Sequence, residues 1–380
     1  MRKTVSIILA AIMALSVALT GCSGGAAAAS SAPAPASSEA ASEAPSGEAP
    51  ATEPLKVALL LSGNLGDMSF LDSSNAGMQA VTQKYGTEVK VIEMGADSSK
   101  YETNVLDASE GDYDIIIGSG WMLQEPFENV AKDFPDKKYI IFDAAVDYTK
   151  ADYSNVYSIN YKQNEASFLA GMMGAKLSKT GKLGFLGGAD GAVINDFLLG
   201  YIEGAQYINK DIKVSAAYIG SYTDSAKCKE MALAQYNQGI DIVFTAAGAA
   251  GLGTLDAAKE QGKFAIGVDS DQAMIFDGSD PDKSKQIPAS VMKRVDNSLV
   301  RAFDMINAGT LKWGTAETLG LAEEAVGLSD NKYYQEIVPA DVRDEITAAA
   351  AKIISGEIKV STAFGKETSE ITAIIDAVKP

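Results

Sequence analysis

Acidic, aromatic and glycine residues recur in short segments that each follow an apolar run of the sequence. An aspartate can accept two hydrogen bonds from vicinal hydroxyls, and a lysine supplies donors. An aromatic ring offers a flat face, on which stacking is worth roughly 1–3 kcal/mol per base, and glycine lets the backbone approach a ligand closely. Such a set suits a small, flat, hydroxylated molecule such as a nucleoside, and it suits a bare sugar almost as well. The candidate binding residues are Asp67, Phe70, Trp121, Asp143, Phe197, Gly248, Asp269 and Lys293.

Each candidate also has a purely structural explanation. Asp67 and Asp143 could cap the helices that follow them, and the three aromatic residues could belong to the core. The glycine-rich segment 248–253 could be a tight turn. Asp269 and Asp271 could hold calcium, but the glycine and glutamate of an EF-hand loop are missing from their places. A binding function is favoured because such groups recur at the same end of successive predicted strands.

Short apolar runs rich in Val, Ile and aromatic residues predict the strands that position these side chains. Amphipathic stretches lie between them, which indicates βαβ units and parallel sheets covered on both faces. We therefore expect an α/β fold with two doubly wound parallel-sheet lobes joined by a hinge. The predicted strands are 56–61, 89–93, 114–118, 139–143 and 156–160 in the first lobe and 182–187, 213–219, 242–245, 264–268 and 289–292 in the second, and the predicted helices are 75–85, 127–133, 165–177, 196–208, 225–238 and 254–261.

Ligands of open α/β sheets sit at the carboxyl ends of the strands. With two lobes, these ends can face each other across a cleft. We expect the first lobe to comprise 55–162 plus about 295–322, and the second lobe 163–294 plus about 323–380. The segment after the first strand, 62–70, does not read G-x-G-x-x-G, and no Gly-Lys-Ser/Thr P-loop occurs, so dinucleotide and Walker-type sites are excluded.

The composition excludes several classes of function. The chain has 380 residues, enough for two domains of ordinary size, and a formal net charge of −18 from 32 Lys and Arg against 50 Asp and Glu. Such an acidic chain lacks the excess of positive charge that is typical of nucleic-acid-binding proteins. It has no His and only two Cys, which excludes His-activated nucleophiles, His-ligated zinc and a disulfide framework. We expect no metal and no cofactor.

The N-terminus has the pattern of an export signal. Two basic residues precede an apolar run over 5–19, and the sequence Leu-Thr-Gly-Cys follows at 19–22. This pattern resembles the lipobox of bacterial lipoproteins, which implies a signal peptide over 1–21 and a lipid on Cys22. Residues 22–54 are nearly all small, Pro or Glu, and we expect them to form a disordered tether that holds the body at the extracytoplasmic face of the cell membrane.

Further segments of the body carry a resemblance to a known family. The most specific are Gly-Val-Asp-Ser-Asp-Gln at 267–272 and the downstream Ser-Val-Met-Lys at 290–293. The full set is 66–70, 130–136, 166–171, 184–188, 197–201, 267–272, 290–293 and 355–360. Together they resemble the basic membrane protein family of bacterial lipoproteins, which are purine-nucleoside-receptor-like substrate-binding proteins of ABC transporters with the type I periplasmic binding protein fold.

The resemblance implies how a nucleoside would be held. Phe70 and Phe197 resemble the pair of rings that sandwich the base between the lobes, and Asp269 and Lys293 resemble the ligands of the ribose hydroxyls. One position departs from the family, whose members have an Asn after the Phe of Asp-x-Ser-Phe that helps to read the base. Here this residue is Leu71, so the resemblance leaves open whether a purine or a pyrimidine is bound.

The other candidates have implied roles as well. Asp67 and Asp143 resemble polar partners in the first lobe, Trp121 resembles a residue lining the pocket, and Gly248 resembles a glycine that the ligand approaches closely. We therefore expect a lipid-anchored binding protein, not an enzyme, that captures a nucleoside and delivers it to an ABC permease.

Three alternatives remain open at this point. The first is a binding protein for a sugar or another small hydroxylated ligand on the same fold. The second is an extracytoplasmic hydrolase of nucleosides or glycosides, with Asp67 and Asp143 as its carboxylate pair. The third is a lipoprotein that binds a ligand and signals to a receptor without transport.

Overall fold

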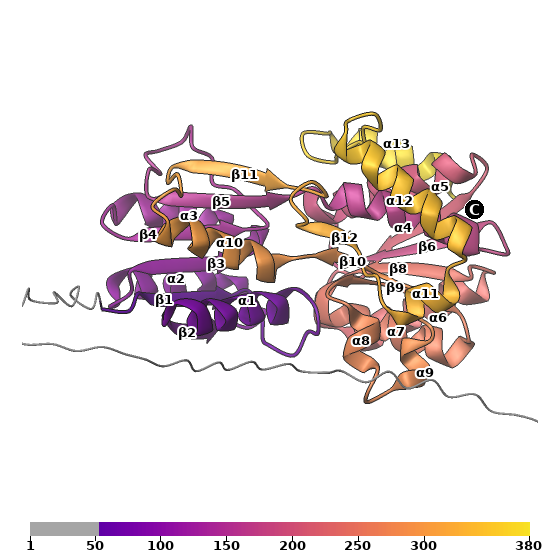
Figure 1. Cartoon of the computed structure of the whole chain (residues 1–380), viewed down its shortest axis with the longest axis horizontal. Coiled ribbons are helices and arrows are strands. Elements are labelled where there is room, and N and C mark those ends of the chain that lie inside the picture. Colours follow the sequence, from indigo (N-terminus) through magenta and orange to yellow (C-terminus); the bar gives the residue numbers. More distant parts are fainter. Residues whose placement is uncertain (1–52) are drawn as a thin grey trace, which may run out of the picture. The chain divides into compact units, whose positions relative to one another are not determined.

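The computed structural model describes residues 53–380. They form two α/β lobes, each built on a six-stranded sheet with helices on both faces (Figure 1), so the predicted fold class is confirmed. The predicted signal peptide, Cys22 and nearly all of the predicted tether lie outside the described residues, and the sequence limits of the two lobes stay a prediction. Between residues 53 and 380, no helix combines the length and the apolar character that crossing a bilayer requires.

The first sheet is parallel, with the strand order β11-β5-β4-β3-β1-β2. Its strands are β1 (Lys56–Leu61), β2 (Glu88–Glu93), β3 (Ile115–Ser119), β4 (Lys138–Phe142), β5 (Val156–Tyr161) and β11 (Thr315–Leu319), and its helices are α1 (Phe70–Tyr85), α2 (Tyr101–Glu110), α3 (Gln124–Val130) and α10 (Val295–Asn307). Successive side chains of a strand point to opposite faces. Leu59 therefore lies in one buried cluster with residues of α1 and α10, whereas Leu60 lies in another with residues of α2 and α3.

The second sheet has the order β12-β10-β9-β8-β6-β7. Its strands are β6 (Lys182–Gly187), β7 (Lys213–Tyr218), β8 (Ile242–Ala246), β9 (Phe264–Asp269), β10 (Ser290–Lys293) and β12 (Val326–Leu328), and its helices are α4 (Gln163–Leu177), α5 (Ala192–Ile208), α6 (Ser225–Asn237), α7 (Leu252–Gln261), α8 (Gln272–Phe276), α9 (Pro281–Ser284), α11 (Lys332–Ile337), α12 (Ala340–Ile354) and α13 (Thr368–Val378). Phe185 packs in the cluster of α4, α5 and α12, and Leu186 packs in that of α6 and α7.

The predicted strands and helices are all present with shifted ends, but two strands and several helices were missed. β11 lies at the edge of the first sheet beside β5, and its mostly exposed residues Thr-Ala-Glu-Thr-Leu show no apolar run. β12 has three residues and pairs antiparallel with β10, so the second sheet is not wholly parallel as expected. α1 begins at Phe70 rather than at 75, which makes the candidate ring the first residue of a helix.

The chain passes between the two sheets at three points, namely between β5 and α4, between β10 and α10, and between β11 and β12. Lys293 is the last residue of β10 and therefore stands at the second of these crossings. A side chain at a crossing can reach groups from both lobes.

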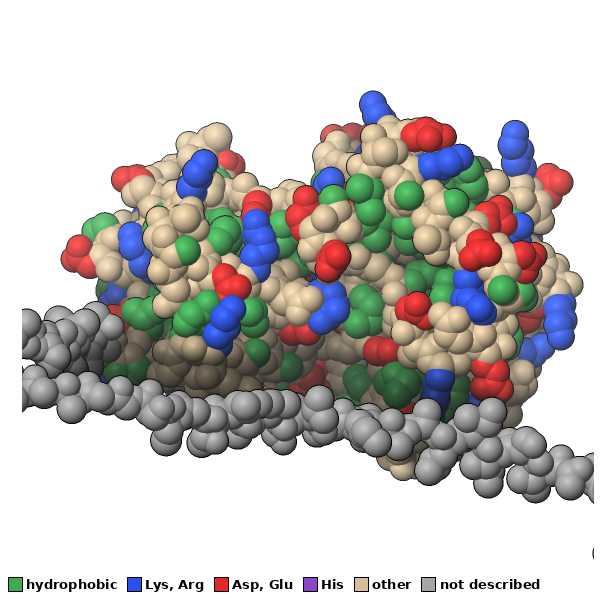
Figure 2. All heavy atoms as spheres, in the orientation of Figure 1, with side chains coloured by type: hydrophobic (Ala, Val, Ile, Leu, Met, Phe, Trp, Pro, Cys, Tyr) green, Lys and Arg blue, Asp and Glu red, His purple; other side chains and the backbone are tan. Residues whose placement is uncertain are grey.

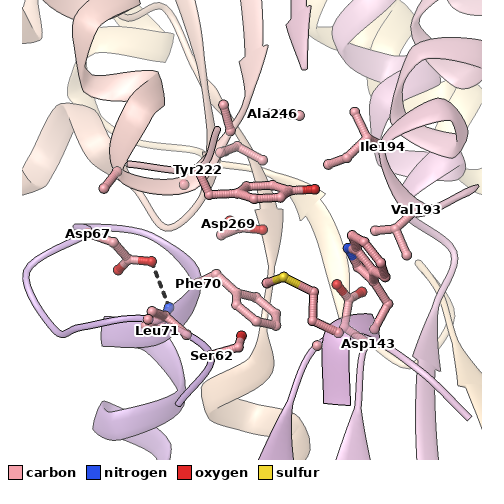
Figure 3. Close-up of a pocket in the computed structure, with 18 of the residues that line it drawn as sticks. Ser62, Asp67, Phe70, Leu71, Asp143, Val193, Ile194, Tyr222, Ala246 and Asp269 are labelled. Carbon is pink, nitrogen blue, oxygen red and sulfur yellow. Dashed lines mark hydrogen bonds between the residues drawn. The ribbon is translucent and has the colours of Figure 1, made fainter. Parts of the chain in front are cut away.

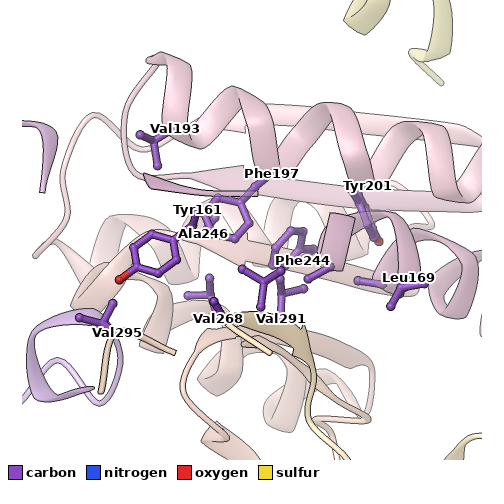
Figure 4. Close-up of a cluster of buried hydrophobic side chains, with 14 of the residues drawn as sticks. Tyr161, Leu169, Val193, Phe197, Tyr201, Phe244, Ala246, Val268, Val291 and Val295 are labelled. Atoms are coloured by element: carbon purple, nitrogen blue, oxygen red, sulfur yellow. The ribbon is translucent and has the colours of Figure 1, made fainter. Parts of the chain in front are cut away.

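Close packing of α4 against α5 holds Phe197 in place. A Cβ atom at Gly204 of α5 would lie 1.8 Å from the backbone oxygen of Phe168 in α4, so only glycine permits this approach. Phe197, two turns earlier in α5, packs with Phe244 of β8 at 6.0 Å between ring centroids, and Tyr201 flanks the same ring at 5.3 Å (Figure 4). The direction of the Phe197 ring is thus fixed by the core of the second lobe.

Candidate ligand-binding site

A cavity lies between the lobes at the carboxyl ends of the central strands (Figure 3). The centre of a water molecule can move within about 110 Å³ of it, and one water occupies about 10–15 Å³ in this measure. The cleft is therefore not filled by the protein's own side chains. All of the candidate residues predicted from the sequence line it, namely Asp67, Phe70, Trp121, Asp143, Phe197, Gly248, Asp269 and Lys293.

A buried charge cluster lies at the hinge side of this cavity. The Nζ atom of Lys293 is 3.0 Å from Oδ1 of Asp143 in the first lobe and 3.8 Å from Oδ1 of Asp269 in the second. The three side chains are 4%, 8% and 7% exposed. Burial raises the pKa of both carboxyls, and the Lys293 ammonium opposes that rise. With one cation for two carboxylates, the cluster disfavours an anionic ligand and suits one that can donate hydrogen bonds.

Strained backbone marks the loops that carry these side chains. Met68, Asp143 and Asp269 have positive φ angles of 51°, 62° and 63°, a region that residues other than glycine rarely adopt. Such conformations cost on the order of 1–3 kcal/mol each and persist only where the surroundings enforce them. At Asp143 and Asp269, the strained turn directs the carboxylate from the end of a strand toward the Lys293 ammonium.

The two candidate phenyl rings face the same ammonium from different lobes. The Nζ atom of Lys293 lies 4.8 Å from the ring centroid of Phe70 and 5.2 Å from that of Phe197. Phe70 also contacts Phe142 of β4 at 5.4 Å between centroids. Phe70 and Phe197 therefore line one shared cavity rather than two separate cores, although Phe197 is only 2% exposed.

Asp67 lies on the cavity wall, but its carboxylate serves the start of α1. Its oxygens accept hydrogen bonds from the backbone N–H groups of Ser69, Leu71 and Asp72, at 3.0, 2.9 and 3.0 Å. Burial raises its pKa to about 6 against these hydrogen bonds. The capping explanation is thus observed for Asp67, whereas Asp143 caps no helix and pairs with Lys293 instead. A contact between Asp67 and a ligand stays a prediction.

Trp121 and Gly248 lie at the borders of the cavity. Trp121 follows β3 and is 44% exposed, so it belongs to the rim rather than to a core. Gly248 opens the short 3-10 turn Gly248–Gly251 with a φ of 54°, a conformation that glycine adopts without strain. Both residues line the cavity, and their contacts with a ligand stay predictions.

Direct hydrogen bonds join the two lobes beside the cavity. The hydroxyl of Ser69 donates to Oδ2 of Asp269 at 2.6 Å, and Nε2 of Gln272 donates to the backbone oxygen of Met68 at 3.2 Å. The hydroxyl of Ser270 donates to the backbone oxygen of Ser69 at 3.2 Å. We call this set of residues the interlobe latch. It holds the described structure in a closed arrangement and was not predicted from the sequence.

The sequence analysis missed several residues of the cavity wall. Tyr222 and Thr223 follow β7, an edge strand of the second sheet whose trailing segment was not considered, and they lie in the cavity lining. Applying the rule of strand ends to β7 as well would have found Tyr222. The other lining residues outside the list of candidates include the polar Ser62 and Asn64 and the apolar Met122, Val193, Ile194 and Val268.

A larger hollow of about 1150 Å³ adjoins the cavity. It shares Trp121, Asp143 and Val193 with the cavity lining and extends to the segment after α12. Figure 2 shows the surface indented between the regions that Figure 1 labels β11 and α13. In the part of the chain that the structure describes, no three His, Cys, Asp or Glu side chains are placed to share a metal ion.

Comparison with known proteins identifies relatives of the whole described body. Residues 55–363 match the family described as ABC transporter substrate-binding protein, PnrA-like. Basic membrane protein A1 of Borrelia garinii is 34% identical over 322 residues, which cover 83% of this chain and 90% of that protein. The ABC transporter nucleoside-binding protein BmpA of Lactococcus lactis is 33% identical over 322 residues, with 80% and 89% covered. A solute-binding protein structure of an ABC transporter system from Aeropyrum pernix has a TM-score of 0.76 at 28% identity, covering 86% of this chain and 97% of that one.

Proposed function

Because the chain belongs to the PnrA-like family of ABC transporter substrate-binding proteins, we propose that it captures a nucleoside between its lobes and delivers it to an ABC permease. The observation that carries the proposal is the joint presence of two phenyl rings, two carboxylates and an ammonium on the wall of one closed cavity. The name of the Lactococcus lactis relative, a nucleoside-binding protein, supports the same ligand class.

In this proposal the base stacks between Phe70 and Phe197, and the ribose faces the charge cluster. The Oδ1 atom of Asp269 is buried and has no hydrogen-bond partner among the described residues. Since buried polar atoms are normally hydrogen-bonded, a ribose hydroxyl that donates to this oxygen would satisfy it. Lys293 would donate to a hydroxyl oxygen while its charge offsets those of Asp143 and Asp269.

The ligand would act on the equilibrium between an open and a closed form of the lobes. It contacts both lobes only in the closed form, and such differential affinity is what drives closure. The closed form then presents a different surface to the permease. We also propose that a lipid on Cys22 keeps the protein at the extracytoplasmic face of the membrane, so that ligand capture takes place close to the transporter.

The geometry disfavours a hydrolase built on Asp67 and Asp143. Both oxygens of Asp67 accept backbone N–H groups, and Asp143 is paired with Lys293. Neither carboxylate is therefore free to act as the acid or base that glycoside hydrolysis requires. Incubating the protein with nucleosides and assaying for free base tests this directly, because only an enzyme would release base over time.

The proposal is tested by calorimetry of the full chain with nucleosides, free bases and ribose. Phe70→Ala should weaken nucleoside binding by about 1–3 kcal/mol, or about 5- to 150-fold, because it removes one stacking surface. Phe134→Ala is the matched control, since Phe134 is half-buried in the first lobe and lies outside the cavity lining. Equal affinity of wild type and Phe70→Ala would contradict the stacking role. Ribose binding as tightly as the nucleosides would favour a sugar-binding protein.

A second variant tests the sugar end of the ligand. Asp269→Ala should cost more affinity for ribonucleosides than for their 2′-deoxy analogues, because the deoxy compounds lack one of the hydroxyls that the carboxylate would accept. The measured quantity is the ratio of the two dissociation constants in wild type and variant. Losses of the same size for both ligands would show that Asp269 does not read a ribose hydroxyl.

A further inference from the structure

Tyr222 is a wall residue of the cavity whose hydroxyl proton has no acceptor among the described residues. It lies in the loop after β7 and reaches the cavity from the second lobe (Figure 3). Its hydroxyl is buried and donates no hydrogen bond to any described residue. Buried polar groups are normally hydrogen-bonded, and a buried donor without an acceptor calls for an explanation. A bound ligand would provide the missing partner.

The position of the Tyr222 ring is held by the surrounding backbone. A Cβ atom at Gly188 would lie 2.3 Å from the ring, so the ring packs directly on the backbone after β6 and requires glycine there. The backbone oxygen of Tyr222 accepts a hydrogen bond from the N–H of Ala250 at 2.9 Å. The first contact thus holds the ring against the backbone after β6, and the second holds the loop that carries Tyr222 on the cavity wall.

Among the buried polar atoms that lack a partner at ordinary hydrogen-bond geometry in the described chain, only two belong to side chains that line this cavity, the Tyr222 hydroxyl and Oδ1 of Asp269. A carboxylate oxygen needs a donor, whereas a phenol can donate. Burial raises the pKa of Tyr222 to about 12, partly opposed by a hydrogen bond from the neighbouring Trp121 side chain. The indole N–H can only donate, so the phenol keeps its proton and that proton has no acceptor within the described residues. The ligand should therefore offer a donor to Asp269 and an acceptor to Tyr222.

Much of the remaining lining is apolar, although Ser62, Asn64 and Trp121 also carry donors. Phe70 and Leu71 contribute apolar surface from the first lobe, and Val193 and Ile194 do so from the start of α5. The polar edge of a heterocycle would find few donors among these side chains.

Building on the proposed function, we propose that Tyr222 determines which ligand is accepted, by donating a hydrogen bond from its hydroxyl to a ring nitrogen or carbonyl oxygen of the bound heterocycle. The ring itself adds a further aromatic surface beside Phe70, Trp121 and Phe197. Ligands that present no acceptor at this point are discriminated against, because the proton of the buried phenol stays unpaired when they bind.

Tyr222→Phe isolates the hydroxyl because it keeps the ring. Its matched control is Tyr236→Phe, since the Tyr236 hydroxyl is also buried but donates to the backbone oxygen of Phe264 at 2.9 Å, outside the cavity. The full chain of each variant is titrated with adenosine, guanosine, inosine, cytidine, uridine and thymidine, and its melting temperature is measured without ligand. Tyr222→Phe should bind the ligand that wild type binds best about 5- to 50-fold more weakly. The six nucleosides should also differ less in affinity for this variant than they do for wild type.

The melting temperatures separate a ligand contact from a structural role. The Tyr222 hydroxyl donates no hydrogen bond within the described residues, so the ligand-free melting temperature of Tyr222→Phe should stay close to that of wild type, whereas that of Tyr236→Phe should fall. Unchanged affinities for the whole panel in Tyr222→Phe would overturn the inference while leaving nucleoside binding intact. A wild-type protein that binds none of the six would instead refute the proposed function, and the inference with it.

Discussion

Replacing Lys293 by Met should destabilise the protein strongly and in a pH-dependent way. At an effective dielectric constant of 20, unit charges 3.0 Å and 3.8 Å apart, as Lys293 is from Asp143 and Asp269, attract each other by about 5 and 4 kcal/mol. Desolvation of the buried charges offsets much of this attraction, and breaking such a pair typically costs about 3–5 kcal/mol. We therefore expect a loss of about 3–5 kcal/mol at pH 8.

The pH dependence follows from the carboxyl groups that remain. Burial already raises the pKa of Asp143 and Asp269, and Lys293 opposes that rise. Without the lysine, their folded-state pKa values rise further above those of the unfolded chain. A carboxyl group whose pKa is higher in the folded protein than in the unfolded chain binds more protons in the folded state. The stability of the protein therefore falls as pH rises from the unfolded-state pKa to the folded-state pKa. The loss in Lys293→Met should therefore be small at pH 4 and full at pH 8.

Urea unfolding at both pH values measures this loss, with Lys84→Met as the matched control. Lys84 forms a surface pair with Asp304 in which the side chains are 51% and 45% exposed, and such pairs contribute about 0–1 kcal/mol. The double variant Lys293→Met with Asp143→Asn should recover part of the loss, because it leaves one buried carboxylate instead of two. A loss at pH 8 no larger than that of the control, or no recovery in the double variant, would refute the reasoning.

Two further predictions concern pH and closure. Burial raises the pKa of Asp196 to about 6, so wild type loses about 3 kcal/mol of stability from this group as pH rises from 4 to 7. In urea unfolding, the stability of Asp196→Asn relative to wild type should therefore increase by about 3 kcal/mol between pH 4 and pH 8. A stability difference that stays constant with pH would contradict this prediction. Ser69→Ala removes the hydroxyl of the interlobe latch that donates to Asp269, a charge-assisted bond worth about 1.5–3 kcal/mol. Small-angle scattering of the ligand-free variant should show a larger radius of gyration than wild type, and an unchanged radius would show that the latch does not hold the lobes closed.

Much of the fold could be predicted because buried parallel strands leave a strong signal. Strands such as β1 and β8 are buried along nearly their whole length, so they read as short apolar runs between helical segments. β11 and β12 leave no such signal, since the first is an exposed polar edge strand and the second has three residues. Their places are decided by pairing with β5 and β10, which are distant in the chain.

The residues that line the candidate site could also be predicted in large part, because most of them directly follow a strand that the sequence reveals. The ends of parallel strands meet at one edge of a sheet, so a rule about strand ends collects residues such as Asp143, Asp269 and Lys293 without knowledge of the fold. It does not say what each side chain does. Asp67 proved to have its carboxylate engaged in capping α1, and Tyr222 was missed because the segment after β7 was not considered.

The sequence by itself determined the two α/β lobes and the list of groups that can meet a ligand, because local periodicity and strand ends are properties of neighbouring residues. Only the tertiary structure decided how these groups pair across the cleft. Ser69 with Asp269 and Asp143 with Lys293 are joined over 150 residues or more of sequence, and their contacts depend on the angle at which the two lobes close. That angle is set by packing and charge at the hinge, which no local pattern in the chain records.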